Sequence, residues 1–291
     1  MCQIPNSFIL MLQTLKRGLG RSYRRLNQNR IPGKLASWAA LPDGSAGVNS
    51  ASDISRRIGE ERAQLYETST GRYYLPTDAP QDCVISCIKS GGVFEPEVVE
   101  TARAYIRPGS TVLDVGANFG QMSVLFSRFV GVGGQVHSFE ADPFVYELLQ
   151  KTLAANNCQN VAAHLGAVYD HPNQQLFYPV QDFKRFQAYG SYGIDPNATA
   201  GRTVKTLTID GLNINTPISF MKVDIQGSDL FALRGAVETI KRHRMPIIFE
   251  FEQRFQAEFR TSFQDYVDFV NSVSYRFEKT VLNINYLIVP R

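Results

Sequence analysis

The chain has 291 residues, of which 44% are hydrophobic and 20% charged, and its formal net charge is +3. This composition is typical of a globular protein with an apolar core, and it excludes collagen-like, disulfide-rich and wholly disordered classes. The four cysteines are too scattered to form a disulfide framework or a zinc site, so we expect a protein of the reducing cytoplasm.

Residues 1–52 are interpreted as a basic arm and linker. Residues 1–35 contain seven basic residues and no acid, so the rest of the chain is net negative and no nucleic-acid partner is expected. The apolar run at 8–12 is far shorter than the roughly 20 residues that a membrane span needs. Weak, peripheral contact of this arm with a membrane surface is a second interpretation.

The elements that follow fall into two parts. Residues 53–110 are predicted to be a helical cap segment, with irregular helical spacing over 53–67 and a helix over 95–106. Residues 111–291 are predicted to be the main domain, in which strands and helices alternate. Strands are expected at 111–115, 135–141, 161–168, 202–209, 218–225 and 245–252, helices at 121–130, 143–157, 229–243 and 263–273, and two further strands close the chain.

This alternation predicts an α/β fold with a mostly parallel sheet that is covered by helices on both faces. No helix separates the two closing strands, which are therefore expected to pair antiparallel. Ligands bind such sheets at the carboxyl ends of the strands, so the residues at those ends are the candidate site.

The first strand ends at Asp114 and is followed by Gly116, Asn118 and Gly120. A dinucleotide fingerprint would need glycine at 118 and 121, where the chain has Asn and Gln, and this argues against a nicotinamide-dependent oxidoreductase. A carboxylate at the mouth of the turn disfavours a pyrophosphate and suits a ligand with an ammonium group. The alternative for Asp114 is a structural role as a solvated residue that caps the next helix.

The second strand ends at Glu140, a place from which a carboxylate can accept hydrogen bonds from ribose hydroxyls. Asp142 is interpreted as the cap of the next helix, which leaves Glu140 available for a ligand. Together the two strand ends predict a nucleoside ligand with an amine and without a diphosphate.

Five segments in order resemble the FkbM-type, S-adenosylmethionine-dependent methyltransferases: DVGANFG, HSFEADP, LGAV, KVDIQGSDLFALRGA and PIIFEFE. The resemblance covers roughly residues 90–290. Three positions depart from the family's pattern: Ala141 replaces a common Pro, and Gln226 and Asp229 each replace a Glu.

The resemblance implies a class I, Rossmann-like methyltransferase with a seven-stranded sheet of order 3-2-1-4-5-7-6, whose last strand is antiparallel. It places the methionine end of S-adenosylmethionine near Asp114 and its ribose at Glu140. The cofactor residues that it implies are Glu95, Asp114, Gly116, Ala117, Asn118, Gly120, Glu140, Ala141, Gly166, Ala167, Asp224 and Gln226.

O-methylation benefits from a base, because a hydroxyl acceptor has a high pKa. Asp224 is the first candidate catalytic residue, and Glu250 and Glu252 are the second candidates, although Glu252 is also interpreted as a solvated loop acid. No metal is expected, because sites for hard cations usually gather more acids. The aromatic-rich residues 177–192 are expected to bind the acceptor, through Tyr189, Ser191 and Tyr192. By analogy with such relatives, the acceptor is a sugar of a glycan or its precursor; the alternatives are a polyketide-like acceptor and a non-catalytic scaffold.

Overall fold

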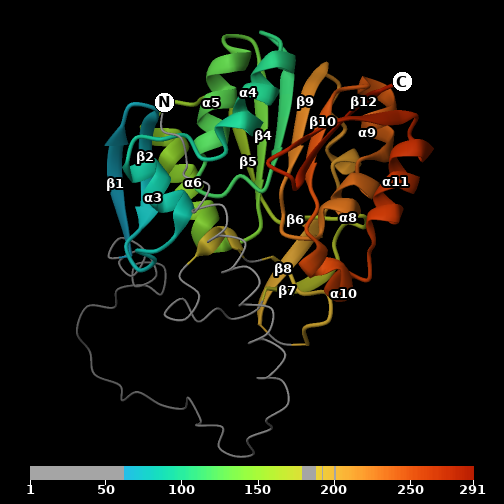
Figure 1. Cartoon of the computed structure of the whole chain (residues 1–291). Helices are drawn as coiled ribbons and strands as arrows, with labels where there is room; N and C mark the ends of the chain where they lie inside the picture. The colour runs from blue at the N-terminus through green and yellow to red at the C-terminus, as the bar shows by residue number, and fades with distance from the viewer. Residues whose placement is uncertain (1–61, 179–187, 192, 200) are drawn as a thin grey trace, which may run out of the picture. The chain divides into compact units, whose positions relative to one another are not determined.

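A computed structural model describes residues 62–178, 188–191, 193–199 and 201–291. Its centre is a seven-stranded sheet of order β11-β12-β10-β9-β3-β4-β5 (Figure 1). The strands are β3 (Thr111–Val115), β4 (Gln135–Glu140), β5 (Val161–Leu165), β9 (Ile218–Val223), β10 (Ile247–Glu250), β11 (Tyr275–Val281) and β12 (Asn285–Pro290). The last strand runs antiparallel to both of its neighbours, and the others are parallel to one another. The predicted strand order and the antiparallel last strand are confirmed.

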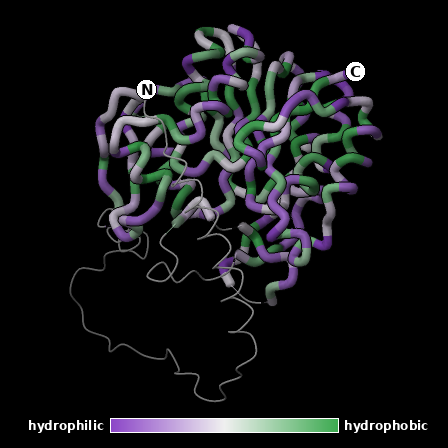
Figure 2. Tube along the Cα trace, viewed as in Figure 1, coloured by the Kyte–Doolittle hydropathy of each residue, from purple (hydrophilic) through white to green (hydrophobic). Residues whose placement is uncertain are grey.

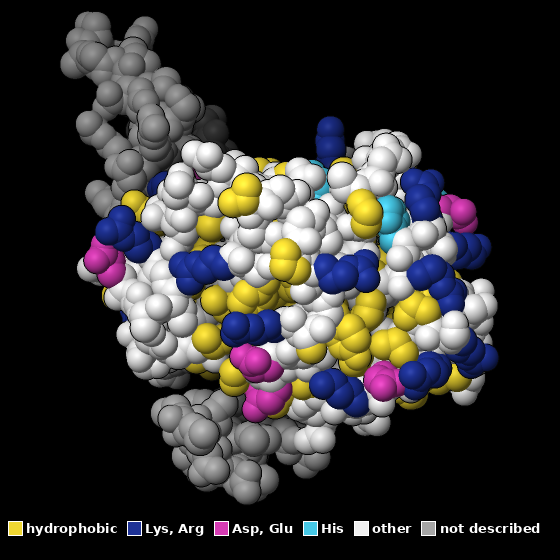
Figure 3. Space-filling view, turned by 90° about the horizontal axis from the view of Figure 1, so that it is seen from above, with side chains coloured by type: hydrophobic (Ala, Val, Ile, Leu, Met, Phe, Trp, Pro, Cys, Tyr) yellow, Lys and Arg dark blue, Asp and Glu magenta, His cyan; other side chains and the backbone are white. Residues whose placement is uncertain are grey.

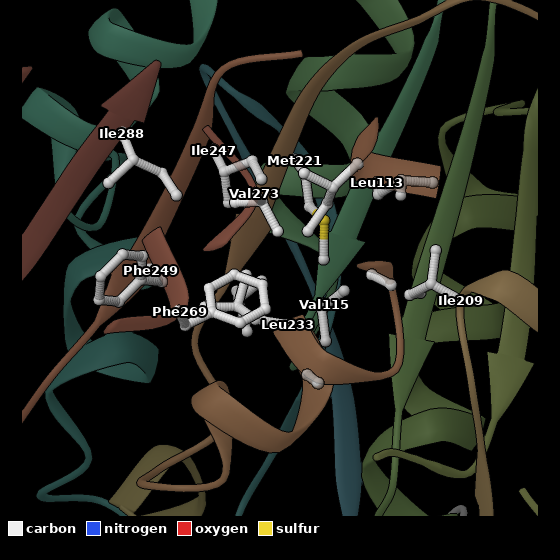
Figure 4. Packing of buried hydrophobic residues seen from close by; sticks show 14 of the residues in the cluster. Leu113, Val115, Ile209, Met221, Leu233, Ile247, Phe249, Phe269, Val273 and Ile288 are labelled. Atoms are coloured by element: carbon white, nitrogen blue, oxygen red, sulfur yellow. The ribbon is translucent and has the colours of Figure 1, made fainter. Parts of the chain in front are cut away.

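Helices cover both faces of this sheet, as predicted. One face carries α4 (Pro96–Tyr105), α5 (Gln121–Val130) and α6 (Pro143–Ala155), and the other carries α8 (Asp229–Arg234), α9 (Val237–His243) and α11 (Phe263–Ser272). Successive strand residues alternate between the faces, so Val112 packs with α4 and α5 whereas Leu113 packs with α8, α9 and α11. Figure 4 shows the cluster that contains Leu113. Figure 2 shows the hydrophobic residues concentrated along the strands.

A second sheet of three strands replaces part of the predicted pattern. It consists of β6 (Ala167–Val168), β7 (Gln175–Tyr178) and β8 (Arg202–Leu207), in the order β6-β8-β7. The predicted strand at 161–168 is therefore wrong as a single strand. It divides at Gly166, which has a φ of +153° and whose added Cβ would lie 2.9 Å from Leu207 Cδ2.

The helical spacing expected over 53–67 is wrong for the residues that the structure describes. They form a hairpin of β1 (Ala63–Thr68) and β2 (Gly71–Pro76), followed by α3 (Cys83–Lys89). The backbone N–H of Tyr74 in β2 donates to Thr152 Oγ1 of α6 at 3.0 Å, so the hairpin packs beside the sheet's helical layer. The predicted arm and linker, residues 1–52, lies outside the described residues.

The predicted helix at 229–243 is divided into α8 and α9 at Gly235. An added Cβ there would lie 2.0 Å from the carbonyl oxygen of Tyr169, so this turn passes against the chain that leaves β6. The helix is therefore interrupted at a residue that has a low helix propensity and that lies in close contact with a distant segment.

No helix in the described part of the chain is both long and apolar enough to cross a membrane. Figure 3 views the molecule from above, on the side opposite to β7, β8 and α10 (Gln256–Phe259) in Figure 1. On this face basic side chains are spread among uncharged ones, and few acidic side chains are visible. The candidate site lies at the other edge of the sheet.

Candidate functional site

The loops that follow three neighbouring parallel strands meet at the carboxyl edge of the sheet. The N–H of Asp224, after β9, donates to the carbonyl of Val115 in β3 at 3.0 Å. The N–H groups of Gly116 and Ala117 donate to the carbonyl of Phe139 in β4 at 3.0 and 2.9 Å. The structure therefore brings together the strand ends from which the site was predicted.

Gly116 is the point where the loop after β3 contacts the turn after β9. Its φ is +83°, and an added Cβ would lie 1.9 Å from the carbonyl oxygen of Asp224. That oxygen belongs to backbone whose N–H is already bonded to β3, so it has little freedom to move. Only glycine fits at this position.

We expect Gly116→Ala to lower the free energy of unfolding by at least about 3 kcal/mol, because it adds a backbone clash to an unfavourable φ. Gly109→Ala is the matched control: its φ is +76°, but an added Cβ would meet nothing within 4 Å. The control should cost only about 1 kcal/mol in urea unfolding followed by circular dichroism. Equal losses in the two variants would show that the contact with Asp224 is unimportant.

Glu140 is held in place by backbone donors on both sides. Its Oε2 accepts from the N–H of Asn118 at 3.0 Å, and its Oε1 accepts from Ala141 and Asp142 at 2.8 and 2.9 Å. The carboxylate thus faces the glycine loop, and Oε2 keeps a second lone pair for a ligand hydroxyl.

Burial raises the pKa of Glu140 from 4.5 to about 7, although the three backbone donors favour its ionised form. A ligand that donates hydrogen bonds to this carboxylate would favour ionisation and lower the pKa again. We therefore expect any ligand that donates to Glu140 to bind with a dependence on pH near neutrality.

Asn118 has a buried acceptor that no described residue satisfies. Its φ is +51°, and its Oδ1 accepts no hydrogen bond among the described residues. An unsatisfied buried acceptor is costly, and a ligand donor is one way to satisfy it. Asn118, in the loop after β3, and Glu140, at the end of β4, thus offer an acceptor and a carboxylate at neighbouring strand ends.

Asp114 lies deeper than the sequence predicts. It is fully buried, its Oδ2 accepts from Ser123 Oγ at 2.6 Å, and its Oδ1 lies 3.7 Å from Lys222 Nζ. Burial raises the pKa of Asp114, and the Lys222 ammonium opposes the rise. Its negative charge therefore has a cationic partner within the protein, and contact with a ligand's amine remains a prediction.

Lys222 is absent from the site residues predicted above, yet it lies at their centre. Its Nζ donates to the carbonyl of Gly116 at 2.7 Å and lies 3.6 Å from Asp224 Oδ2. Burial lowers the pKa of Lys222, but the surrounding carboxylates, Asp224 and Asp114 foremost, outweigh this and raise it. The available signal is a lysine inside the apolar strand ISFMKV.

Asp224 and Glu250, the two predicted catalytic residues, are joined by Gln226. The Nε2 of Gln226 lies 3.1 Å from both Asp224 Oδ1 and Glu250 Oε2. Asp224 is partly exposed, whereas Glu250 is buried. Within the described residues, no group of three or more His, Cys, Asp or Glu is placed to hold a metal ion.

Asp229 lies fully buried behind this cluster. Its Oδ2 accepts from the N–H of Gly227 at 3.2 Å, and its Oδ1 accepts no hydrogen bond among the described residues. Burial and, next, the charge of Asp224 raise the pKa of Asp229 to about 7. It supports the turn after β9 from within.

The described end of the predicted acceptor segment, residues 188–191, and Gly193 just after it lie at the same edge of the sheet. An added Cβ at Gly190 would lie 3.0 Å from Asn118 Nδ2, and one at Gly193 would lie 3.1 Å from the carbonyl of Gln226. The segment therefore contacts both the glycine loop and the turn after β9.

The ring of Tyr189 is buried against Phe119 and Phe144. Its hydroxyl donates to Asp78 Oδ1 at 2.7 Å and accepts from Arg62 at 3.0 Å. Tyr189 therefore anchors the segment. Ser191 is partly exposed, Tyr192 lies outside the described residues, and their contact with an acceptor remains a prediction.

The remaining predicted cofactor residues surround Glu140 and Lys222. Gly166 donates its N–H to the carbonyl of Glu140 at 3.0 Å, and Ala167 follows as a buried residue of β6. Glu95 precedes α4 with a φ of +49° and contributes to the raised pKa of Lys222. Their contact with a cofactor is untested.

The strand order and the glycine loop after the first strand define a class I methyltransferase fold. A family model described as the methyltransferase FkbM domain matches residues 114–277, which is more than half of the chain. The chain belongs to the FkbM methyltransferase family. No curated protein matches it.

Solved structures that resemble the chain are remote in sequence. A methyltransferase FkbM from Methylobacillus flagellatus KT is 18% identical over 66% of this chain, with a TM-score of 0.42, and the match spans 50% of that protein. A SAM-dependent methyltransferase from Aquifex aeolicus is 16% identical, covers 67% and 88% of the two chains and has a TM-score of 0.38. TYW2 from M. jannaschii, in complex with AdoMet, is 10% identical, covers 78% and 84% and has a TM-score of 0.42.

Proposed function

We propose that this methyltransferase uses S-adenosylmethionine and transfers the methyl group to a hydroxyl, on a sugar of a glycan or a glycan precursor. The observation that carries the cofactor part of the proposal is the carboxylate of Glu140, held by backbone N–H groups beside the glycine loop. A fixed carboxylate at this strand end suits the paired hydroxyls of a ribose.

The residues at the loop fit the other parts of this cofactor. The unsatisfied Oδ1 of Asn118 is an acceptor for a donor such as the cofactor's ammonium group. Gly116 and Gly120 let the backbone approach the ligand, with φ values of +83° and +88°. Gly166 and Ala167, beside Glu140, are proposed to border the adenine, and Asp114 and Glu95 add negative charge near the amine.

S-adenosylmethionine supplies a methyl group on a cationic sulfur that reacts with a nucleophile in line. The task of the chain is to orient the acceptor and to take its proton. Asp224 is proposed to accept this proton, since its carboxylate is partly exposed beside the glycine loop. Lys222 forms an ion pair with Oδ2 of that carboxylate, and Gln226 donates a hydrogen bond to its Oδ1.

The acceptor is proposed to lie against the segment that contains Gly190, Ser191 and Gly193, which spans the glycine loop and the turn after β9. The proposal of a sugar depends on the aromatic residues of this insert. Of these, Phe183, Phe186 and Tyr192 lie outside the described residues. The alternatives are a polyketide-like hydroxyl acceptor and a scaffold that binds the cofactor without turnover.

The test is incubation of the full-length protein with methyl-labelled S-adenosylmethionine and fractionated glycans or lipid-linked sugars of the source cell. We expect label in a sugar methyl ether that survives alkali. Label in a sugar-free product would contradict the sugar acceptor. Cofactor binding with no transfer to any fraction would favour the scaffold.

Cofactor binding should depend on pH through Glu140. Ribose hydroxyls donate to the ionised carboxylate, whose pKa is about 7 in the free protein. We therefore expect the affinity for S-adenosylmethionine to rise about tenfold from about pH 6 to about pH 8, measured by calorimetry. In Glu140→Gln the binding should be weak and flat over this range.

Asp229→Asn and Glu258→Gln are the matched controls for this pH dependence, because both carboxyls also have pKa values of about 7. Each control should retain the rise. A rise that disappears in either control and persists in Glu140→Gln would assign the proton to another group.

A further inference from the structure

Gln226 makes three side-chain hydrogen bonds at the centre of the proposed catalytic cluster. Its Nε2 donates to Asp224 Oδ1 and to Glu250 Oε2, each at 3.1 Å. Its Oε1 accepts from Arg254 at 2.9 Å. The side chain starts from a backbone with a φ of +54°, so the turn itself projects the amide between the two carboxylates.

Arg254 fixes the direction in which this amide points. A guanidinium can only donate hydrogen bonds, so the group that faces it must be the amide oxygen. Glu252 in turn holds Arg254 through two bonds, from Nε at 3.1 Å and from the terminal nitrogen at 2.9 Å. The amide nitrogen is therefore directed at Asp224 and Glu250, and turning the amide over would place N–H groups against the guanidinium.

The bridging group is a donor where two negative charges approach one another. Two carboxylates on either side of one N–H group repel each other when both are ionised. A proton, a cation or a hydrogen-bond donor between them reduces this repulsion. The family pattern described above has Glu at this position, which would add a third carboxylate rather than a donor. In this chain an amide N–H donor lies between the two carboxylates.

We propose that Gln226 is a positioning residue whose amide nitrogen stands in for a metal ion between Asp224 and Glu250. The two carboxylates are thereby held together without a divalent cation. The assignment of these carboxylates to catalysis rests on the proposed function, but the bridge itself does not. Arg254 is a second positioning residue, because it fixes which end of the Gln226 amide faces the carboxylates.

The test is a titration of the full-length protein with Mn²⁺, followed by electron paramagnetic resonance and calorimetry. In Gln226→Glu the donor becomes an acceptor, and three carboxylates converge on one point. We expect this variant to bind about one Mn²⁺ per chain at least about tenfold more tightly than the wild type. Gln253→Glu, which adds the same charge at an exposed position of the segment after β10, should bind no more tightly than the wild type.

Arg254→Met gives a second test that keeps Gln226. Without the guanidinium the amide can turn its oxygen toward the carboxylates, so Mn²⁺ affinity should rise by at least about threefold. Each variant is first checked for a wild-type circular dichroism spectrum. If Gln226→Glu fails this check, the Arg254→Met result decides.

Two results would overturn the inference. One is a wild type that already binds Mn²⁺ as tightly as Gln226→Glu. The other is no gain of Mn²⁺ affinity in either folded variant. Neither result bears on S-adenosylmethionine binding, which is titrated separately, so failure of the inference and failure of the proposed function remain distinguishable.

Discussion

Lys222→Met is expected to lower the free energy of unfolding by about 3–5 kcal/mol, because it leaves a charged carboxylate buried without its partner. Asp114 is fully buried, and its Oδ1 accepts no hydrogen bond within the described residues and has the Lys222 ammonium 3.7 Å away. The substitution also removes the hydrogen bond from Nζ to the carbonyl of Gly116, which shapes the glycine loop.

Urea unfolding followed by circular dichroism measures this loss, and two controls define its cause. Lys241→Met removes an exposed ammonium that pairs with Glu238, so it should change stability by less than about 0.5 kcal/mol. Adding Asp114→Asn to Lys222→Met removes the lone charge and should recover about half of the loss. No recovery in the double variant would mean that the ion pair is not the source of the effect.

Asp224→Asn is expected to reduce turnover by about 10²–10⁴-fold, since the amide retains the shape of the carboxylate but accepts no proton. The affinity for S-adenosylmethionine should change by less than about threefold, because other residues are proposed to bind the ribose and the amino-acid end of the cofactor. Single-turnover transfer from labelled cofactor measures the rate, and calorimetry measures the binding.

Asp170→Asn is the control for this substitution, because Asp170 pairs with His171 in the loop after β6 and is not among the proposed site residues. It should leave both quantities unchanged. Equal losses of turnover and cofactor affinity in Asp224→Asn would make Asp224 a binding residue rather than a base.

The central sheet could be predicted because its strands are short apolar runs between clear turn signals. β3 and α5 have the bounds predicted, since TVLDV is buried throughout and Gly120 and Gly131 delimit the helix. The hairpin of β1 and β2 was missed although Ser69 and Thr70, a two-residue turn, separate its paired ends. The break at Gly235 had only a weak local signal, since a single glycine is tolerated within many helices, and its close contact with Tyr169 could not be read from the sequence.

The location of the candidate site could be predicted from the residues at the strand ends. The partners of its charged side chains could not. Glu140 could be placed at the strand end because it is the last residue of β4, and its carboxylate contacts the N–H of Asn118 in the neighbouring loop. Asp114 was expected to face a ligand, but register places it beside Lys222 on the neighbouring strand. Pairing across strands decides which charges are neutralised within the protein, and a single strand's sequence does not contain that information.

The crystal structure of the protein with S-adenosylhomocysteine tests the central claim most directly. The account predicts the ribose hydroxyls within hydrogen-bond distance of the Glu140 carboxylate and the amino-acid end of the ligand over the loop from Gly116 to Gly120. A ligand bound away from the carboxyl ends of β3 and β4, or a ribose that makes no contact with Glu140, would contradict it.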